Sequence, residues 1–220
     1  LPMRLLTARC DTRTSTSYQP VAALMRQMLE GPGRLKRPAA VEPLLSGAPE
    51  AGPAADAADA DGSHAPQLRE AIVAFFRQAA ANGPLALAIE DLQWADHATL
   101  DLLPILAEAL RESPVLLLAT YRAEEIPNRH PLRATRHELR RRDCLQEWRL
   151  EPLAAADSER LLAATLGGRP APGLAELVHR RSRGLPLFVE ETARALLASD
   201  ALVATDAGLA LREGEELPLP

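Results

Sequence analysis

The sequence predicts an α/β fold in which a parallel β-sheet carries helices on both faces and is followed by a smaller helical region. Short runs at 85–89 and 115–119 are apolar at every position, which is typical of strands buried on both sides. Longer stretches with apolar residues at helical spacing alternate with these runs. After Pro152 the helical pattern continues without strands as far as residue 199.

The first elements are a strand and two helices. Residues 3–10, MRLLTARC, predict a short strand, and residues 19–30 predict an amphipathic helix that ends at Gly31. Residues 31–66 are rich in Pro, Gly, Ala and Asp and predict a flexible insertion, because such a segment buries little apolar surface. A second amphipathic helix follows at 66–82 and ends at an Asn-Gly-Pro sequence.

The middle of the chain continues the alternation. The strand LALAIE runs into Asp91, and a helix follows over about 95–112 with Asp96 as its N-cap. The next strand is VLLLATYR, at 115–122. A basic helix at 131–142 and a third extended segment at 145–153 complete this part.

These patterns divide the chain into three regions. Residues 1–150 form the α/β domain, and residues 151–199 form a small lid of three helices. Residues 200–220 alternate around an Asp-Ala-Gly turn and predict a hairpin that begins a further domain.

Composition excludes several functions. The 220 residues have a net charge of −5, and no apolar run is long enough to cross a bilayer. The basic segment 129–142 has no aromatic residues that could stack on bases, so we expect a solvated helix face and no direct nucleic-acid binding. Cys10 and Cys144 have neither metal-ligand nor redox spacing, and no cationic leader is evident, so we expect a cytoplasmic protein.

Four polar residues follow the two apolar strands. Glu90 and Asp91 end one strand, and Thr120 and Arg122 end the next. Carboxyl ends of parallel strands meet at one edge, which is where α/β sheets bind their ligands. Paired carboxylates suit a nucleotide site, where one holds Mg²⁺ and the other orients the attacking water. The alternative is that both acids only cap the following helix.

Three motifs, IEDLQWAD, LLLATYRAEE and RGLPLFVEE, resemble in order and spacing the ATPase domain of the STAND branch of AAA+ proteins. The resemblance extends from residue 4 to residue 219. It is closest to the type found in large bacterial LuxR-family transcriptional regulators and in ATPases attached to adenylate cyclases or kinases. It implies a P-loop NTPase-like fold with ATP and Mg²⁺ as cofactors.

The resemblance also implies roles for single residues. Glu90 and Asp91 match the Walker B element, which implies that Glu90 takes the magnesium position and Asp91 that of the catalytic acid. Thr120 and Arg122 match the sensor-1 segment near the γ-phosphate. Gly184 and Pro186 match the Gly-x-Pro motif of the lid, which packs near the adenine. Without the resemblance, Arg122 is a surface cation, Gly184 a helix stop, and Pro186 the first residue of a helix.

One expected motif does not occur. No G-x-x-x-x-G-K-[ST] sequence is found, and Lys36, the only lysine, follows a predicted helix rather than a strand. The resemblance therefore implies a fragment that lacks the first, central strand, the phosphate loop and the first helix. The missing strand would leave a gap of roughly 9 to 10 Å. Either the flanking strands close it, or the segment at 145–153 detaches, or another chain fills it.

The resemblance implies that the chain is part of an ATP- and Mg²⁺-dependent signalling switch, within a bacterial transcriptional regulator that hydrolyses ATP. We expect negligible ATPase activity from this polypeptide alone, because its acids repel phosphate and no lysine offsets them. The alternative is a degenerate, non-catalytic scaffold that binds protein partners or associates with itself. A plain helical interaction domain would require 85–90 and 115–120 to be helical.

Overall fold

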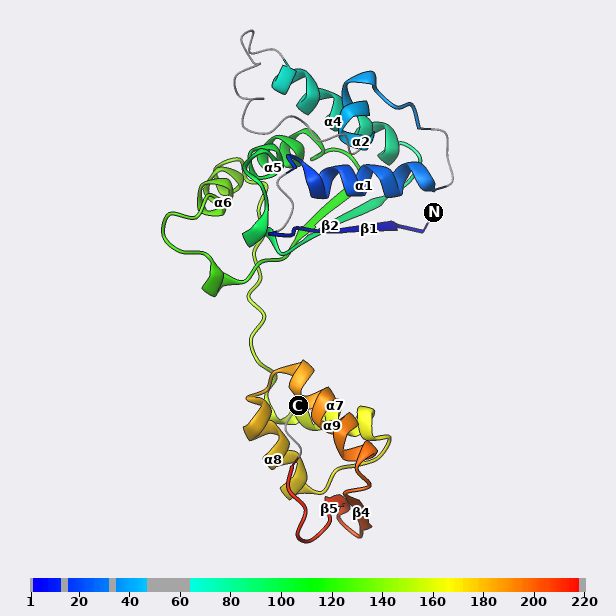
Figure 1. The fold of residues 1–220 in the computed structure, drawn as a ribbon, viewed down its shortest axis with the longest axis vertical. Coiled ribbons are helices and arrows are strands. Elements are labelled where there is room, and N and C mark those ends of the chain that lie inside the picture. Colours follow the sequence, from blue (N-terminus) through cyan, green and yellow to red (C-terminus); the bar gives the residue numbers. More distant parts are fainter. Residues whose placement is uncertain (1, 13–15, 32–34, 47–63, 218–220) are drawn as a thin grey trace. The chain divides into compact units, whose positions relative to one another are not determined.

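A computed structural model describes residues 2–12, 16–31, 35–46 and 64–217 (Figure 1). The chain forms two compact units, residues 1–146 and residues 147–220. Each has its own apolar core.

The first unit is built on a three-stranded parallel sheet in the order β1-β2-β3. The strands are β1 (Arg4–Arg9), β2 (Leu85–Glu90) and β3 (Val115–Ala119). Their register aligns Arg9 with Glu90 and Ile89 with Ala119, so all three carboxyl ends lie at one edge. The predicted α/β class, with a P-loop NTPase-like parallel sheet and flanking helices, is confirmed.

Helices pack against this sheet through one continuous core (Figure 1). They are α1 (Gln19–Glu30), α2 (Glu42–Ser46), α4 (His64–Ala80), α5 (His97–Ala109) and α6 (Leu132–Arg141), with short 3-10 turns η1 (Ala39–Val41), η2 (Leu92–Trp94) and η3 (Ala123–Glu125). Leu6, Leu87 and Ile89 point from the sheet into the core. Phe75 and Phe76 are fully buried there and meet edge to face at 5.5 Å.

The second face of the sheet is also apolar but is open in the described structure. Side chains alternate between the faces of a strand, so Leu5, Ala86 and Leu116 share this face through their register. Leu5 is 62% exposed, Leu116 52% and Leu118 42%. The strand patterns make both faces apolar, as the sequence predicts. Helices were expected on both faces, but the described helices cover only one of them.

The predicted third extended segment does not join the sheet. Residues 144–154 form neither helix nor strand, and Trp148 and Leu150 are 71% and 95% exposed. Among the described residues, β3 is therefore an edge strand.

Part of the predicted flexible insertion is folded. Residues 39–46 form η1 and α2, and Val41 and Leu44 are buried in the core against α1 and α4. The prediction was wrong for this part, because two apolar residues three apart are enough to anchor one helical turn. Residues 47–63 lie outside the described residues.

The second unit is a three-helix cluster with a hairpin. Its elements are α7 (Ala155–Leu166), α8 (Pro172–Ser182), α9 (Pro186–Ala198), β4 (Leu202–Thr205) and β5 (Gly208–Leu211). Leu162, Val189 and Leu196 form its centre. Leu209 and Leu211 of the hairpin pack against the same core, so the hairpin is part of this unit.

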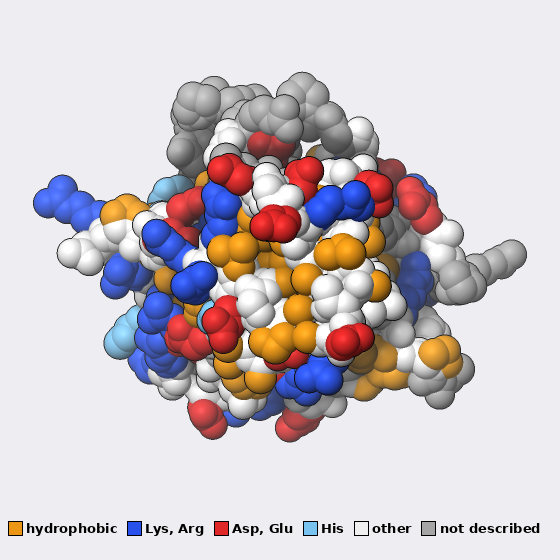
Figure 2. Space-filling view, turned by 90° about the horizontal axis from the view of Figure 1, so that it is seen from below, with side chains coloured by type: hydrophobic (Ala, Val, Ile, Leu, Met, Phe, Trp, Pro, Cys, Tyr) orange, Lys and Arg blue, Asp and Glu red, His pale blue; other side chains and the backbone are white. Residues whose placement is uncertain are grey.

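The charged side chains of the surface are of both signs. Figure 2 shows acidic and basic side chains interspersed over the face it views, with hydrophobic side chains between them. Within the described ranges, no helix is both long and apolar enough to cross a membrane.

Candidate functional site

Four of the predicted site residues meet at the carboxyl edge of the sheet. Asp91 donates its backbone N–H to Thr120 Oγ1 at 3.3 Å, and the neighbouring Leu92 N–H donates to the Thr120 carbonyl at 2.9 Å. Arg122 follows Thr120, and Glu90 precedes Asp91. The parallel register brings these two loops together, since Ile89 lies beside Ala119.

Asp91 turns the chain immediately after β2. Its backbone has φ 59° and ψ 46°, a left-handed conformation that Asp tolerates better than most residues. The turn ends the strand and begins η2, since the Trp94 N–H donates to the Asp91 carbonyl at 2.9 Å. The αL conformation therefore determines where the Asp91 carboxylate lies at this edge.

Both oxygens of the Asp91 carboxylate are engaged. Arg9 donates from Nε to Oδ2 at 2.6 Å, and Gln93 donates from Nε2 to Oδ1 at 3.2 Å. Desolvation raises the pKa of Asp91, but the hydrogen bonds from Arg9 and Gln93 outweigh it. The positive charges of Arg9 and Arg122 act in the same direction, so the pKa lies below its ordinary value of 3.8. Asp91 is therefore an ionised acid near neutral pH.

Glu90 is held quite differently. It is the exposed last residue of β2, and in the register of the sheet it lies beside Arg9 of β1. Its backbone carbonyl accepts from the Cys10 N–H at 3.0 Å, while its carboxylate has no hydrogen-bond partner among the described residues. Of the two acids, Glu90 is the one whose oxygens are available to a cation.

Arg122 lies on the same edge with its guanidinium half exposed. Its Nη1 donates to Glu125 Oε1 at 3.2 Å, within η3. Its backbone N–H donates to Gln93 Oε1 at 3.2 Å. The loop after β3 is thereby tied to the loop after β2 through the Gln93 side chain.

Three residues at this edge were not identified from the sequence: Arg9, Gln93 and His130. Arg9 ends β1, and only the register places it beside Asp91. Leu132 N–H donates to His130 Nδ1 at 3.2 Å, so the ring proton resides on Nε2, which donates to the Gln93 carbonyl at 2.9 Å. The position of Arg9 at the end of a predicted strand could have placed it at this edge from the sequence alone. No sequence pattern indicates that His130 lies there.

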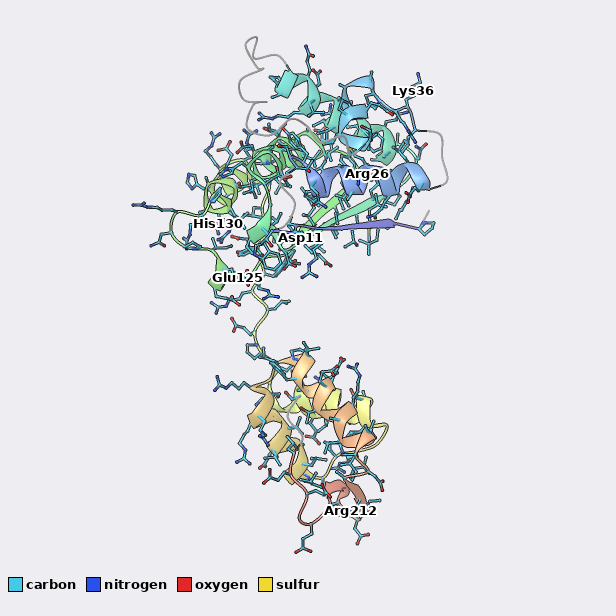
Figure 3. The ribbon with its side chains drawn as sticks, in the orientation of Figure 1. Asp11, Arg26, Lys36, Glu125, His130 and Arg212 are labelled. Carbon is cyan, nitrogen blue, oxygen red and sulfur yellow. The ribbon has the colours of Figure 1, made fainter. Side chains whose placement is uncertain are left out.

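Lys36 does not contribute to the edge. Figure 3 shows Asp11, Glu125 and His130 toward the carboxyl end of the strands, and Lys36 with Arg26 toward the opposite side of the first unit. The only lysine of the chain is thus far from the acids, as its place after a helix predicts.

Gly184 and Pro186 lie in the second unit, where backbone geometry accounts for both. Gly184 has φ 74°, and a Cβ built there would meet the Leu153 carbonyl oxygen at 2.3 Å. Leu153 N–H donates to the Gly184 carbonyl at 2.8 Å. Pro186 is the first residue of α9, where its missing N–H costs nothing.

Two neighbouring carboxylates at this edge could contribute ligands to a metal ion. Within the described ranges, no group of three or more His, Cys, Asp or Glu could hold a metal ion. Mg²⁺ commonly uses one or two carboxylates, with water and substrate phosphates as its other ligands. Glu90, whose carboxylate has no partner among the described residues, and Asp91, which is ionised beside it, are the two residues here that could hold such a cation.

Comparison with known proteins gives two matches. Residues 3–118 match the AAA ATPase domain family, a range that includes Arg9, Glu90 and Asp91. Over 113 residues the chain is 35% identical to an uncharacterised protein of Rhizobium meliloti (strain 1021). The aligned part is 50% of this chain and 10% of that protein, so the chain spans about a tenth of its relative. No solved structure matches.

Proposed function

Because the chain belongs to the AAA ATPase domain family, we propose that it is the acidic half of an ATP- and Mg²⁺-dependent switch. The proposal rests on the carboxyl edge of the sheet, where Glu90 and Asp91 lie beside the loop of Thr120 and Arg122. Phosphoryl transfer uses carboxylates that hold Mg²⁺ or orient water and cationic side chains that stabilise charge on the phosphates, and both kinds of group lie at this edge.

Each residue has its own role in this proposal. Glu90 would hold Mg²⁺, directly or through water, since its exposed carboxylate has no partner within the described ranges. A Mg²⁺ ion held there would neutralise charge on the phosphates. Asp91, which is ionised, accepts a hydrogen bond from the attacking water and orients it. Thr120 and Arg122 would lie near the γ-phosphate, where the guanidinium would stabilise negative charge.

The wider context is also part of the proposal. We place the chain in a STAND-type ATPase of a LuxR-family bacterial regulator, where slow hydrolysis times a conformational change. Gly184 and Pro186 then belong to a lid that responds to the nucleotide. The free thiols of Cys10 and Cys144 favour a reducing, cytoplasmic setting. Segments outside these 220 residues supply the phosphate loop.

The test uses the gene product extended upstream until it includes an in-frame phosphate loop. We expect slow ATP hydrolysis from the extended protein and a loss of at least tenfold in Asp91→Asn. The control is Asp101→Asn, which removes an exposed acid of α5. The proposal fails if no phosphate loop is encoded upstream, or if both variants hydrolyse ATP at the parental rate.

A second candidate is a scaffold that binds a protein partner without catalysis. The open sheet face favours it, since Leu5, Leu116 and Leu118 form an exposed apolar surface beside the free edge of β3. A scaffold would bind its partner equally with and without MgATP. Nucleotide-dependent binding, measured by calorimetry, would favour the switch.

A further inference from the structure

Gln93 uses every polar group of its side chain at the carboxyl edge. It lies in η2 and is 5% exposed. Its Nε2 donates to Asp91 Oδ1 at 3.2 Å, and its Oε1 accepts from the Arg122 N–H at 3.2 Å. Its backbone carbonyl accepts from His130 Nε2 at 2.9 Å. One residue thus joins the loop after β2, the loop after β3 and the segment that begins α6.

The orientation of the Gln93 amide is determined by its two partners. Asp91 offers only an acceptor, and the Arg122 backbone offers only a donor. A flipped amide would place its oxygen against the carboxylate and its NH₂ against an N–H. Because the group is buried, the lost hydrogen bonds would not be replaced by water.

We propose that Gln93 is a positioning residue of the nucleotide site, which couples the orientation of the Asp91 carboxylate to the position of the Arg122 backbone. The inference rests on the proposed function, because it takes Asp91 as the acid that orients water. Gln93 itself touches neither water nor phosphate. It acts through Asp91, by occupying Oδ1 and leaving the charge of the carboxylate in place.

His130 extends this coupling to α6. Its ring lies between the Gln93 carbonyl and the backbone N–H of Leu132, and Leu132 is the first residue of α6. The His130 ring therefore connects α6 to η2, the turn that carries Gln93. The Gln93 side chain connects the same turn to the Arg122 backbone.

Two substitutions separate positioning from simple packing. Gln93→Leu removes both side-chain hydrogen bonds. Gln93→Glu keeps an acceptor for the Arg122 N–H but places a second carboxylate beside Asp91, with nearly the same shape. The matched control is Gln67→Glu, which adds the same charge at an exposed position of α4.

The measurement is a pH titration of carboxyl ¹³C resonances in the whole chain without nucleotide, with Asp91 assigned through Asp91→Asn. We expect the pKa of Asp91 to rise in Gln93→Leu. In Gln93→Glu we expect two coupled steps, the upper one above the wild-type value, since neighbouring carboxylates resist joint ionisation. The Arg122 amide resonance should shift in Gln93→Leu and stay near its wild-type position in Gln93→Glu.

The proposal is overturned if Asp91 titrates as in wild type in a folded Gln93→Glu, or if that variant and Gln67→Glu change the titration equally. Should Gln93→Leu fail to fold, the near-isosteric Gln93→Glu decides alone. The titration needs no nucleotide, so absence of ATPase activity in the extended protein would refute the proposed function and leave this result standing.

Discussion

Arg9 and Asp91, 82 positions apart in the chain, form an ion pair in which Arg9 Nε lies 2.6 Å from Asp91 Oδ2. The Asp91 side chain is 14% exposed and that of Arg9 62%, so the acid is enclosed while the base reaches solvent. The pair closes the carboxyl edge between β1 and the loop after β2.

Removing Arg9 should raise the pKa of Asp91. Desolvation raises this pKa, and the hydrogen bond and positive charge of Arg9, which lower it, would be lost. In Arg9→Gln we expect the ¹³C titration of Asp91 to move upward from its depressed wild-type midpoint. Arg212→Gln, an exposed change in the second unit, should leave it unmoved.

The sign of the linked stability follows from this shift. The pKa of Asp91 is lower in the folded chain than in the unfolded chain. Its contribution to the free energy of unfolding is therefore complete above the unfolded pKa, and it is lost as the pH falls through the folded pKa. Arg9→Gln should reduce the difference in urea midpoint between pH 6 and pH 3. Because Arg9 is mostly exposed, we expect a small change. An unchanged difference would show that the pair contributes nothing.

Gly184→Ala should destabilise the second unit. The backbone there has φ 74°, and an added Cβ would meet the Leu153 carbonyl at 2.3 Å. We expect a loss of about 1–3 kcal/mol in the free energy of unfolding, measured by circular dichroism in urea. Gly173→Ala is the control. Its Cβ would meet nothing within 4 Å inside α8, so we expect no loss and a gain of up to about 1 kcal/mol.

Asp96→Ala should destabilise the first unit. Asp96 is the N-cap of α5 and accepts from the Thr99 N–H at 2.8 Å and from the Tyr18 N–H at 3.1 Å. We expect a loss of about 1–2 kcal/mol in unfolding free energy. Asp101→Ala, exposed on the same helix, should cost much less. Equal losses in the two variants would contradict the cap assignment.

Cys10 should resist thiol reagents in the folded chain. It is 2% exposed, and burial, followed by the charges of Asp96 and Asp91, raises its pKa to about 12. Cys144 is only half-buried. At pH 8 we expect iodoacetamide to modify Cys144 first, with Cys10 reacting at a comparable rate only in urea. Comparable rates in the native chain, read by peptide mass spectrometry, would contradict the burial of Cys10.

Local patterns predicted the elements closely. The helix expected at 19–30 is α1, and the two apolar runs are β2 and β3. Periodicity succeeds here because each element buries one stripe or face, and that burial is written in residues close together in the chain. The same reasoning predicted that Glu90 and Asp91 would meet the loop of Thr120, since parallel strands end at a common edge.

The sequence by itself determined the order of strands and helices, the α/β class and the meeting of the polar loops that follow β2 and β3. Only the tertiary structure decided that Arg9 holds Asp91, that Gln93 bridges it to Arg122, and that Val41 is buried. These contacts join segments far apart in the chain. They depend on strand register and helix packing, which no short stretch of residues specifies alone.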